Sequence, residues 1–513
     1  MFSKSLICNK FTGIKQKDSM FSAKQISASD MQNVELFNTL SNGGVGIRTA
    51  KGNISVCGLL AEDENVVNIF DTVQKGVHNF LVHTENTEEG RLYLFDVSKK
   101  ELIAKKTGLK KTGISTGCDF ANGWADLFVF SNTEEMFSLE LGRLDEVGNL
   151  DEIVEMPLKD RDGREIKGLG CVNFDGRLWI FNGNVLWYSV QENIYDFITA
   201  DLEIVTSAGY IEFVKPITAI YPYLGSLAVF FSDSSVLISP IENGFSASEE
   251  SPGGCANDKA LVYHGVKLYY YDNNKKGIFS FNQEIAGNKL IGDNIAEEIQ
   301  EWLVSIPQSR LNECRLDSVV TKDRNELWFL IPDSDTTFST ILIYDCVREA
   351  WVKRKSQRIS CFRVINEVFY SAGSDIYQEY AGEDFAGRFI EAYYQCTPLN
   401  LGSDNMIKIF YYPPRMTIDL KYENNFYVRY RKNYDTLKTS RTRFITADTI
   451  KNVLYWDVGK WDIGCFSPKF LNAIVKLPPA KFNSLEITFF NTQKGEEFCI
   501  KTFECSKIKM KQC

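Results

Sequence analysis

The side chains best suited to chemistry lie late in the chain, in a run where aromatic and basic residues alternate. In residues 426–431, strand alternation would place the apolar side chains on one face and the arginines on the other. The candidate contact residues of this region are Arg429, Arg431, Lys432, Arg441 and Arg443. Such a face can meet phosphate or an acidic partner. A merely solvated strand face is the alternative.

Two indoles follow, in Trp456-Asp457-Val458-Gly459-Lys460-Trp461. Paired indoles can form a stacking platform for a sugar, and they can equally pack in a core or at a subunit interface. Trp302, in a predicted helix, is a third candidate for aromatic packing or an interface. Both interpretations stay open at this point.

The motifs of enzymes and cofactor sites are missing. The sequence has no P-loop, no Gly-x-Ser-x-Gly elbow and no His-Glu-x-x-His pair. Its 3 His leave little for a triad, and its 13 Cys include no Cys-x-x-Cys pair. We therefore predict no catalytic, cofactor-binding or metal-binding residues, and a protein that is not an enzyme. Glycoside hydrolysis needs only two carboxylates, so motifs leave it open.

The elements that would position these residues begin with a repeated aromatic hairpin. Residues 175–188 read as two short strands joined by a tight Asn-Gly turn. Similar stretches occupy residues 90–96, 125–131, 225–231, 266–272, 325–330 and 366–371. A single hairpin cannot bury both faces, so each copy needs neighbours.

The spacing of these copies favours a β-propeller. Anchored on their Leu or Val, they stand at positions 92, 127, 178, 227, 268, 327 and 368. Intervals near 40–50 residues are typical of propeller blades. The intervals are uneven, and a large β-sandwich is the alternative.

The chain therefore divides into three predicted parts. Residues 1–50 would form an extended N-terminal strap, and residues 51–385 a β-propeller. One amphipathic helix, 293–306, would interrupt it, capped by Asp293 and ended by Pro307. Residues 386–513 would form an antiparallel β-sandwich-like domain, with a strand at 497–503 that could close the propeller. The predicted fold class is mainly β.

Composition agrees with a globular β protein. Aromatic residues make up 13% of the chain, as expected of cross-strand filler in packed sheets. The net charge of −10 disfavours tight nonspecific binding to duplex DNA. The first ten residues lack an apolar core long enough for a secretory signal, and no run matches a membrane helix. We expect a protein without a membrane span, made in a reducing compartment.

The order of features resembles a known family. Phe11-Thr12-Gly13-Ile14 and Gly43-Gly44 precede the hairpins, the helix pattern around Trp302 lies between them, and residues 397–403 precede the Trp-rich segment. Together these resemble the tail nozzle or tail hub proteins of short-tailed bacteriophages, also called packaged-DNA stabilisation proteins. The resemblance is loose, spans most of the chain and contains no single diagnostic motif.

This resemblance implies a structural role in the virion tail, with assembly in the host bacterial cytoplasm. Six copies would form a ring below the portal and adaptor, continuing the DNA channel and helping to retain and release the genome. The partners implied are further copies, the portal or adaptor and other tail proteins, with packaged DNA passing without sequence-specific binding. No catalytic residue carries over. The alternatives are a carbohydrate-binding or carbohydrate-cleaving propeller and a monomeric protein-interaction scaffold.

Overall fold

The computed structural model describes residues 2–8, 10–15, 25–39, 43–58, 60, 63–121, 126–144, 149–200, 206–242, 244–281, 291–333, 337–399, 406–419, 421–422, 424–433, 440–446, 472–477 and 480–512. It divides into two compact units. Unit 1 comprises Met1–Ile54, Thr340–Ser356 and Tyr380–Cys513, and unit 2 comprises Ser55–Ser339 and Gln357–Glu379.

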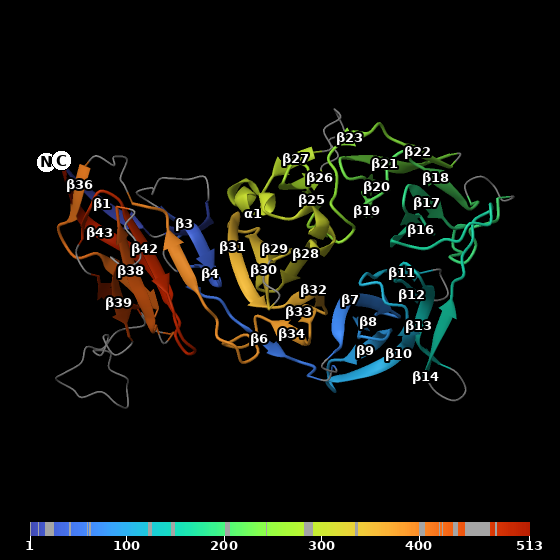
Figure 1. The fold of residues 1–513 in the computed structure, drawn as a ribbon, viewed down its shortest axis with the longest axis horizontal. Helices are drawn as coiled ribbons and strands as arrows, with labels where there is room; N and C mark the ends of the chain where they lie inside the picture. The colour runs from blue at the N-terminus through green and yellow to red at the C-terminus, as the bar shows by residue number, and fades with distance from the viewer. Residues whose placement is uncertain are drawn as a thin grey trace. The chain divides into compact units, whose positions relative to one another are not determined.

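Unit 2 carries most of the β-propeller, and unit 1 contributes Thr340–Ser356 and residues 53–54 to its strands. In the described part of the chain, seven small sheets follow one another as blades, each entered through its first strand (Figure 1). Blade 1 is β7 (Asn65–Gln74), β8 (Val77–Glu85), β9 (Gly90–Asp96) and β10 (Glu101–Leu109); blade 2 is β11 (Thr116–Ala121), β12 (Asp126–Ser131), β13 (Met136–Leu144) and β14 (Asn149–Glu155); blade 3 is β15 (Gly170–Phe174), β16 (Arg177–Asn182), β17 (Val185–Tyr188) and β18 (Gly209–Glu212).

The remaining blades follow the same order. Blade 4 is β19 (Ala219–Tyr223), β20 (Ser226–Phe230), β21 (Ser234–Ile241) and β22 (Gly244–Ala247), with β23 (Ser251–Pro252) beside β21; blade 5 is β24 (Leu261–His264), β25 (Lys267–Asp272), β26 (Gly277–Phe281) and β27 (Ile291–Asn294); blade 6 is β28 (Arg315–Thr321), β29 (Arg324–Ile331), β30 (Phe338–Asp345) and β31 (Ala350–Gln357); blade 7 is β32 (Ile359–Ile365), β33 (Val368–Gly373), β34 (Ile376–Glu379) and β6 (Asn53–Ser55).

The blades close into a ring. The first strands of successive blades lie side by side, and β32 of blade 7 lies beside β7 of blade 1. One apolar cluster joins these two blades, including Ile69 and Phe80 from blade 1 and Cys361 and Tyr370 from blade 7. Backbone pairing just after β6 completes the closure, because Val56 N–H donates to the Ile376 carbonyl at 2.9 Å. The predicted propeller fold is confirmed.

Aromatic rings pack between neighbouring blades, which explains the high aromatic content. The ring pairs and their centroid separations are Phe70–Phe128 (5.2 Å), Trp179–Phe245 (4.8 Å), Phe230–Tyr270 (5.1 Å), Tyr271–Phe329 (5.0 Å), Trp328–Phe369 (4.6 Å) and Phe80–Tyr370 (4.9 Å). Each fully buried ring contributes several kcal/mol, on the order of 3–5 by truncation. These junctions hold the ring together.

Each of the seven predicted hairpins lies in a different blade. In six blades the anchor residue is on the second strand, whereas Leu92 is on the third strand of blade 1. This explains the short first interval. In blade 3, the hairpin register Asn182↔Val185 makes the turn Gly183-Asn184 rather than Asn-Gly. Gly183 has a φ of +59°, which glycine adopts without steric cost.

The helical segment is shorter than predicted. It consists of a 3-10 turn (Glu297–Ile299), α1 (Gln300–Val304) and a second 3-10 turn (Gln308–Glu313). Asp293 lies in β27 and is not the cap; the Oδ1 of Asn294 accepts the Ala296 N–H at 3.0 Å instead. The predicted apolar stripe is buried at Ile299, Leu303 and Ile306.

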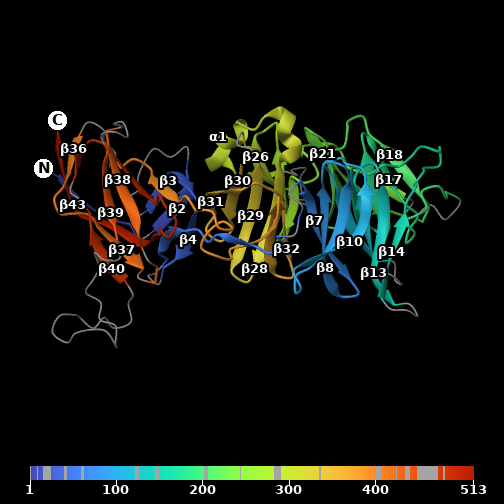
Figure 2. The same cartoon turned by 60° about the horizontal axis from the view of Figure 1, so that its bottom comes forward.

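Unit 1 is built on one sheet of 14 strands among the described residues, with β37–β40 visible together in Figure 2. Its strands are β1 (Phe2–Cys8), β2 (Lys10–Ile14), β3 (Gln25–Gln32), β4 (Val34–Asn38), β5 (Val45–Thr49), β35 (Tyr393–Cys396), β36 (Met406–Phe410), β37 (Arg415–Asp419), β38 (Phe426–Lys432), β39 (Arg441–Ile445), β40 (Asn472–Lys476), β41 (Lys481–Phe482), β42 (Leu485–Phe490) and β43 (Cys499–Gln512).

This sheet folds over itself into a sandwich-like unit. Four strands separate β42 from β43 in the sheet order, which would place them about 24 Å apart in a flat sheet. The rings of Phe489 and Phe503 nevertheless lie 6.4 Å apart. Both side chains are fully buried. The pairing is mainly antiparallel, with β2 parallel to β3 and to β5.

Two predictions about the chain ends are wrong. Residues 1–50 are not a strap, because β2, β3 and β5 lie inside the sheet of unit 1. The strand predicted at 497–503 does not close the propeller; β43 pairs with β1, β5, β36 and β37. The closing strand is β6, a three-residue element too short to be recognised in the sequence.

Candidate functional site: the basic strand pair and its neighbouring hollow

The predicted alternation along residues 426–431 is present in β38. Phe426, Val428 and Tyr430 are buried, while Arg429 and Arg431 are half-buried on the opposite face. Strand β39 pairs with β38 and adds exposed Arg441 and Arg443. Across the two strands Arg441 is opposite Tyr430 and Arg443 is opposite Val428, so these two arginines lie on the other face of the sheet from Arg429 and Arg431. The candidate basic residues therefore occupy both faces of this strand pair. Their predicted role as phosphate or partner contacts stays a prediction.

Several of these cations have partners within the unit. Arg431 Nη2 contacts the carboxylate of Glu486, which is buried. Arg443 Nη1 donates to the Lys476 carbonyl at 2.8 Å. The guanidinium of Arg429 lies 4.8 Å from the centre of the Phe490 ring. An incoming anion would therefore compete with internal contacts, most strongly at Arg431, where the ion pair is partly desolvated.

Arg429 also lines a hollow of about 460 Å³ in unit 1. The wall combines aromatic rings, carboxylates and amides: Phe389, Tyr393, Phe490, Asp30, Glu391, Gln395 and Asn491. Aromatic faces with a few placed polar groups are usual in small-molecule sites. The volume and the mixture suit a sugar or a short polar peptide.

The carboxylate of Asp30 is already committed. Its Oδ1 accepts from Lys353 Nζ at 2.7 Å, and its Oδ2 accepts from the Tyr393 hydroxyl at 2.6 Å. Burial, together with the negative charge of Asp30, raises the pKa of Tyr393. Tyr393 is thus a fixed neutral donor, and Asp30 is a poor general base.

Of the three tryptophan candidates, the structure describes Trp302. Trp456 and Trp461 lie outside the described residues. Trp302 lies in α1 and is half-buried between the buried Ile299 and Leu303. Trp302 belongs to unit 2, whereas Arg429 belongs to unit 1.

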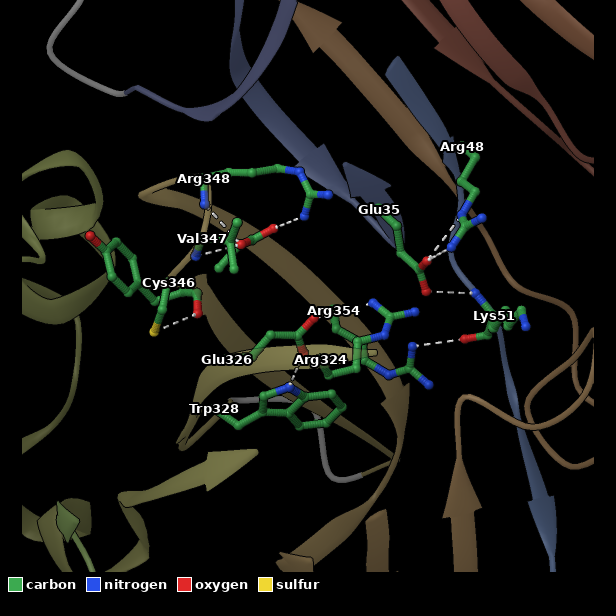
Figure 3. Close-up of polar contacts among 12 residues, drawn as sticks. Glu35, Arg48, Lys51, Arg324, Glu326, Trp328, Cys346, Val347, Arg348 and Arg354 are labelled. Atoms are coloured by element: carbon green, nitrogen blue, oxygen red, sulfur yellow. Dashed lines mark hydrogen bonds and ion pairs between the residues drawn. The ribbon is translucent and has the colours of Figure 1, made fainter. Parts of the chain in front are cut away.

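Further ion pairs are structural (Figure 3). In unit 1, both oxygens of Glu35 are used: Oε2 accepts from Arg48 Nη2 at 2.9 Å, and Oε1 accepts from the Lys51 N–H at 3.1 Å. Arg354 Nη1 donates to the Lys51 carbonyl at 2.9 Å. These contacts fix the segment after β5, because each buried charge is satisfied by the backbone or by an opposite charge.

A separate group in unit 2 is also structural. Glu326 accepts from Arg324 Nη1 at 3.1 Å and from the indole N–H of Trp328 at 2.9 Å. All three residues belong to β29 and point along one strand face at alternate positions. These hydrogen bonds hold the indole of Trp328 in one orientation at the junction with blade 7.

Three buried thiols and one buried imidazole have strongly shifted pKa values. Burial raises the pKa of Cys8, Cys314 and Cys499 to about 12 in each case, so these thiols stay protonated at neutral pH. Burial lowers the pKa of His83 to about 3. Within the described ranges, no group of three or more His, Cys, Asp or Glu side chains could hold a metal ion.

One polar cluster escaped the sequence analysis: the charged residues Asp258, Lys259, Arg315, Asp317 and Arg363, which face the axis of the propeller. They come from three blades, so no local motif marks them. The available signal was Arg315-Leu316-Asp317, in which charged residues alternate with an apolar one.

Comparisons with known proteins give little beyond these observations. No family model matches the chain, and no curated protein matches it. A quinonprotein alcohol dehydrogenase-like protein from Bacteroides thetaiotaomicron is similar in structure, with 8% identity and a TM-score of 0.35 over 62% of this chain and 69% of that chain. Hsv2 of Kluyveromyces lactis shows 14% identity and a TM-score of 0.28 over 54% of this chain and 82% of that chain.

These scores are too low to support an argument about function. The fold assignment rests on the blades themselves. Among the helices in the described part of the chain, none is long and apolar enough to span a membrane.

Proposed function

We propose that the protein is a non-enzymatic structural component of a bacteriophage tail, forming a ring that continues the DNA channel. The family resemblance of the sequence motivates the proposal. The observation that carries it is the use of the aromatic hairpins: one lies in each blade, and their rings pack at the blade junctions. A chain whose distinctive residues all serve packing fits a building block.

In this role the DNA would pass between copies and not through a propeller. The axial cavity of the propeller measures about 190 Å³. A DNA duplex, whose major groove alone is about 8.5 Å deep and 12 Å wide, cannot enter it. The channel would therefore be enclosed by neighbouring subunits. The net charge of −10 supports passage without strong phosphate contacts.

Native mass spectrometry and particle imaging of the purified chain test this proposal. We expect closed rings, six copies according to the resemblance, with an open centre wide enough for a duplex. Mixing with purified portal and adaptor proteins of the same phage should give a stable complex. A monomer that persists at high concentration and binds neither protein would contradict the proposal and favour an interaction scaffold.

A second candidate function is carbohydrate binding, and the hollow beside Arg429 favours it. The test is a glycan-binding screen of the full chain, with Phe490→Ala as the variant that removes an aromatic wall. Tyr411→Ala is the matched control, because Tyr411 is an exposed aromatic outside the hollow. Binding lost in the first variant alone supports the candidate. Absence of glycan binding in the unmodified chain, or equal loss in both variants, contradicts it.

A further inference from the structure

The first strands of the blades surround a polar cavity on the propeller axis. It measures about 190 Å³ and is lined by residues of β7, β11, β15, β19, β24, β28 and β32. This is smaller than the roughly 300–1,000 Å³ of pockets for drug-sized ligands. Its charged wall would suit a small ion.

The cavity holds more positive than negative side chains. Lys259, Arg315 and Arg363 face Asp258 and Asp317, leaving one excess positive charge when all five are ionised. Arg363 Nη1 lies 3.5 Å from Asp317 Oδ1, so these two charges are paired. Arg315 and Asp317 are each less than one-tenth exposed. The carboxylate of Asp258 interacts with both Lys259 and Arg315, so these two cations share one nearby opposite charge. The remaining positive charge is costly to bury.

Arg315 is held by a neutral partner. Its Nη1 donates to the Oδ1 of Asn68 at 2.7 Å. Asn68 is itself fixed, because its Nδ2 donates to the Ser115 carbonyl at 3.0 Å. The amide orients the guanidinium without neutralising it. Arg315 is therefore a positioned cation whose charge is not neutralised by this hydrogen bond.

Lys259 is the second such cation. Its backbone is fixed, since its carbonyl accepts from the Leu316 N–H at 2.8 Å. In the described part of the chain, its ammonium makes no hydrogen bond. Burial, and after it the positive charge of Arg315, lower the pKa of Lys259 to about 8. An anion between the two would relieve this repulsion.

A second cavity gives access to these cations. It measures about 380 Å³, shares Lys259 and Arg315 with the first, and adds Arg310 and Arg358. Arg310 pairs with Glu313, and the side chain of Glu313 is 42% exposed. This part of the cavity wall therefore reaches solvent. An ion entering here would meet Lys259 and Arg315 before the paired Arg363 and Asp317.

We propose that Lys259 and Arg315 form a binding site for a small oxyanion, such as phosphate or a phosphate ester, at the axis of the propeller. Phosphate oxygens accept charge-assisted hydrogen bonds from both ammonium and guanidinium groups. The bound anion would neutralise the excess positive charge and tie blades 5 and 6 together. This site does not depend on the proposed role in a virion.

Isothermal titration of the full chain with sodium phosphate tests the site, with sodium chloride at matched ionic strength as the reference. Pyrophosphate in a second titration separates a site for free phosphate from one that prefers a larger phosphate compound. We expect saturable binding of phosphate or pyrophosphate. Lys259→Met should weaken it at least tenfold, and Lys259→Arg should retain it. Lys267→Met is the matched control, because Lys267 is exposed in the same blade, and it should leave binding unchanged.

Hydrogen exchange of the unmodified chain gives a measurement that needs no variant to fold. Phosphate should slow amide exchange at residues 258–262 and 315–317, and chloride should not. Saturable binding lost in Lys259→Met with protection at these residues supports the proposal. No saturable binding, equal binding by Lys259→Met, or protection only elsewhere overturns it.

Discussion

Trp328 combines three contacts in one side chain. It is fully buried, its ring lies 4.6 Å from that of Phe369 and 5.8 Å from that of Phe362, and its N–H donates to Glu326. Both phenylalanines belong to blade 7. A single residue thus joins two blades of the ring.

Trp328→Ala should therefore destabilise the propeller by about 3–5 kcal/mol, because the cavity it leaves cannot collapse inside a closed ring. Guanidinium unfolding followed by circular dichroism measures the loss. Val266→Ala, at a residue 75% exposed, is the control and should change the midpoint little. Equal midpoints for the two variants would contradict this role for Trp328.

His83 makes stability depend on pH. Its ring is fully buried between blades 1 and 2, with Nδ1 3.0 Å from the Ser115 hydroxyl and Nε2 unpartnered among the described residues. Burial lowers its pKa to about 3, against about 6.5 in the unfolded chain. Between these two pKa values, His83 is therefore protonated in the unfolded state and neutral in the folded state.

Its contribution is complete above pH 6.5 and falls as the pH drops toward 3. Between pH 7 and 5 we expect a loss of about 2 kcal/mol from this residue. His83→Gln removes the titrating group, so the variant should lose less stability over the same interval. Unfolding midpoints at pH 7, 6 and 5 measure the difference, and parallel pH profiles would refute the assignment to His83.

At the scale of elements, the short strand β6 and the residues after it close the propeller. Beyond the Val56 hydrogen bond, the carboxylate of Asp375 accepts from the Ser55 hydroxyl and, at 3.0 Å, from the Gly58 N–H. Contacts within residues 55–58 thus attach this early segment of the chain to blade 7, the last blade of the ring.

Val56→Pro should open this closure, because proline has no N–H to donate to Ile376 and cannot continue the strand pairing. Hydrogen exchange should accelerate first in blades 1 and 7. Val56→Ala keeps the N–H and should preserve most of the protection. Uniform acceleration in all blades would mean that the closure is not a separate weak point.

The hairpins could be predicted from sequence because each is a local pattern of alternation and turn residues. The short first interval between hairpin copies also has a local cause, because the clearest copy in blade 1 lies on β9 and not on β8. The face of β38 was predictable for the same reason. The axial set of Lys259, Arg315 and Arg363 was not, because residues from separate blades meet only after the ring closes.

At the scale of the whole molecule, the two compact units do not correspond to two continuous parts of the sequence. Unit 1 takes its strands from both ends of the chain, and β43 pairs with β1 and β5. Such pairing leaves no trace in local periodicity, which is why residues 1–50 looked like a strap. Contacts such as the hydrogen bond from the Tyr394 hydroxyl to the Thr12 carbonyl, at 2.8 Å, make this segment integral to the unit.

Removing residues 1–50 should therefore unfold unit 1 and leave the propeller folded, since residues 55–58 remain. Limited proteolysis with mass mapping should show cleavage throughout residues 390–512 and protection of residues 65–330. A truncated chain in which both regions stay protected would contradict the role of β2, β3 and β5 in the sheet.

The pairing of β5 with β43 also sets an order of events during synthesis. Cys499, the partner of Arg48, leaves the ribosome 451 residues later (499 − 48). At 5–20 residues per second this is a delay of roughly 20–90 s. During that time the propeller can mature while the early strands wait without their final neighbour. Newly made chains would thus complete the sheet of unit 1 only after β43 has been synthesised.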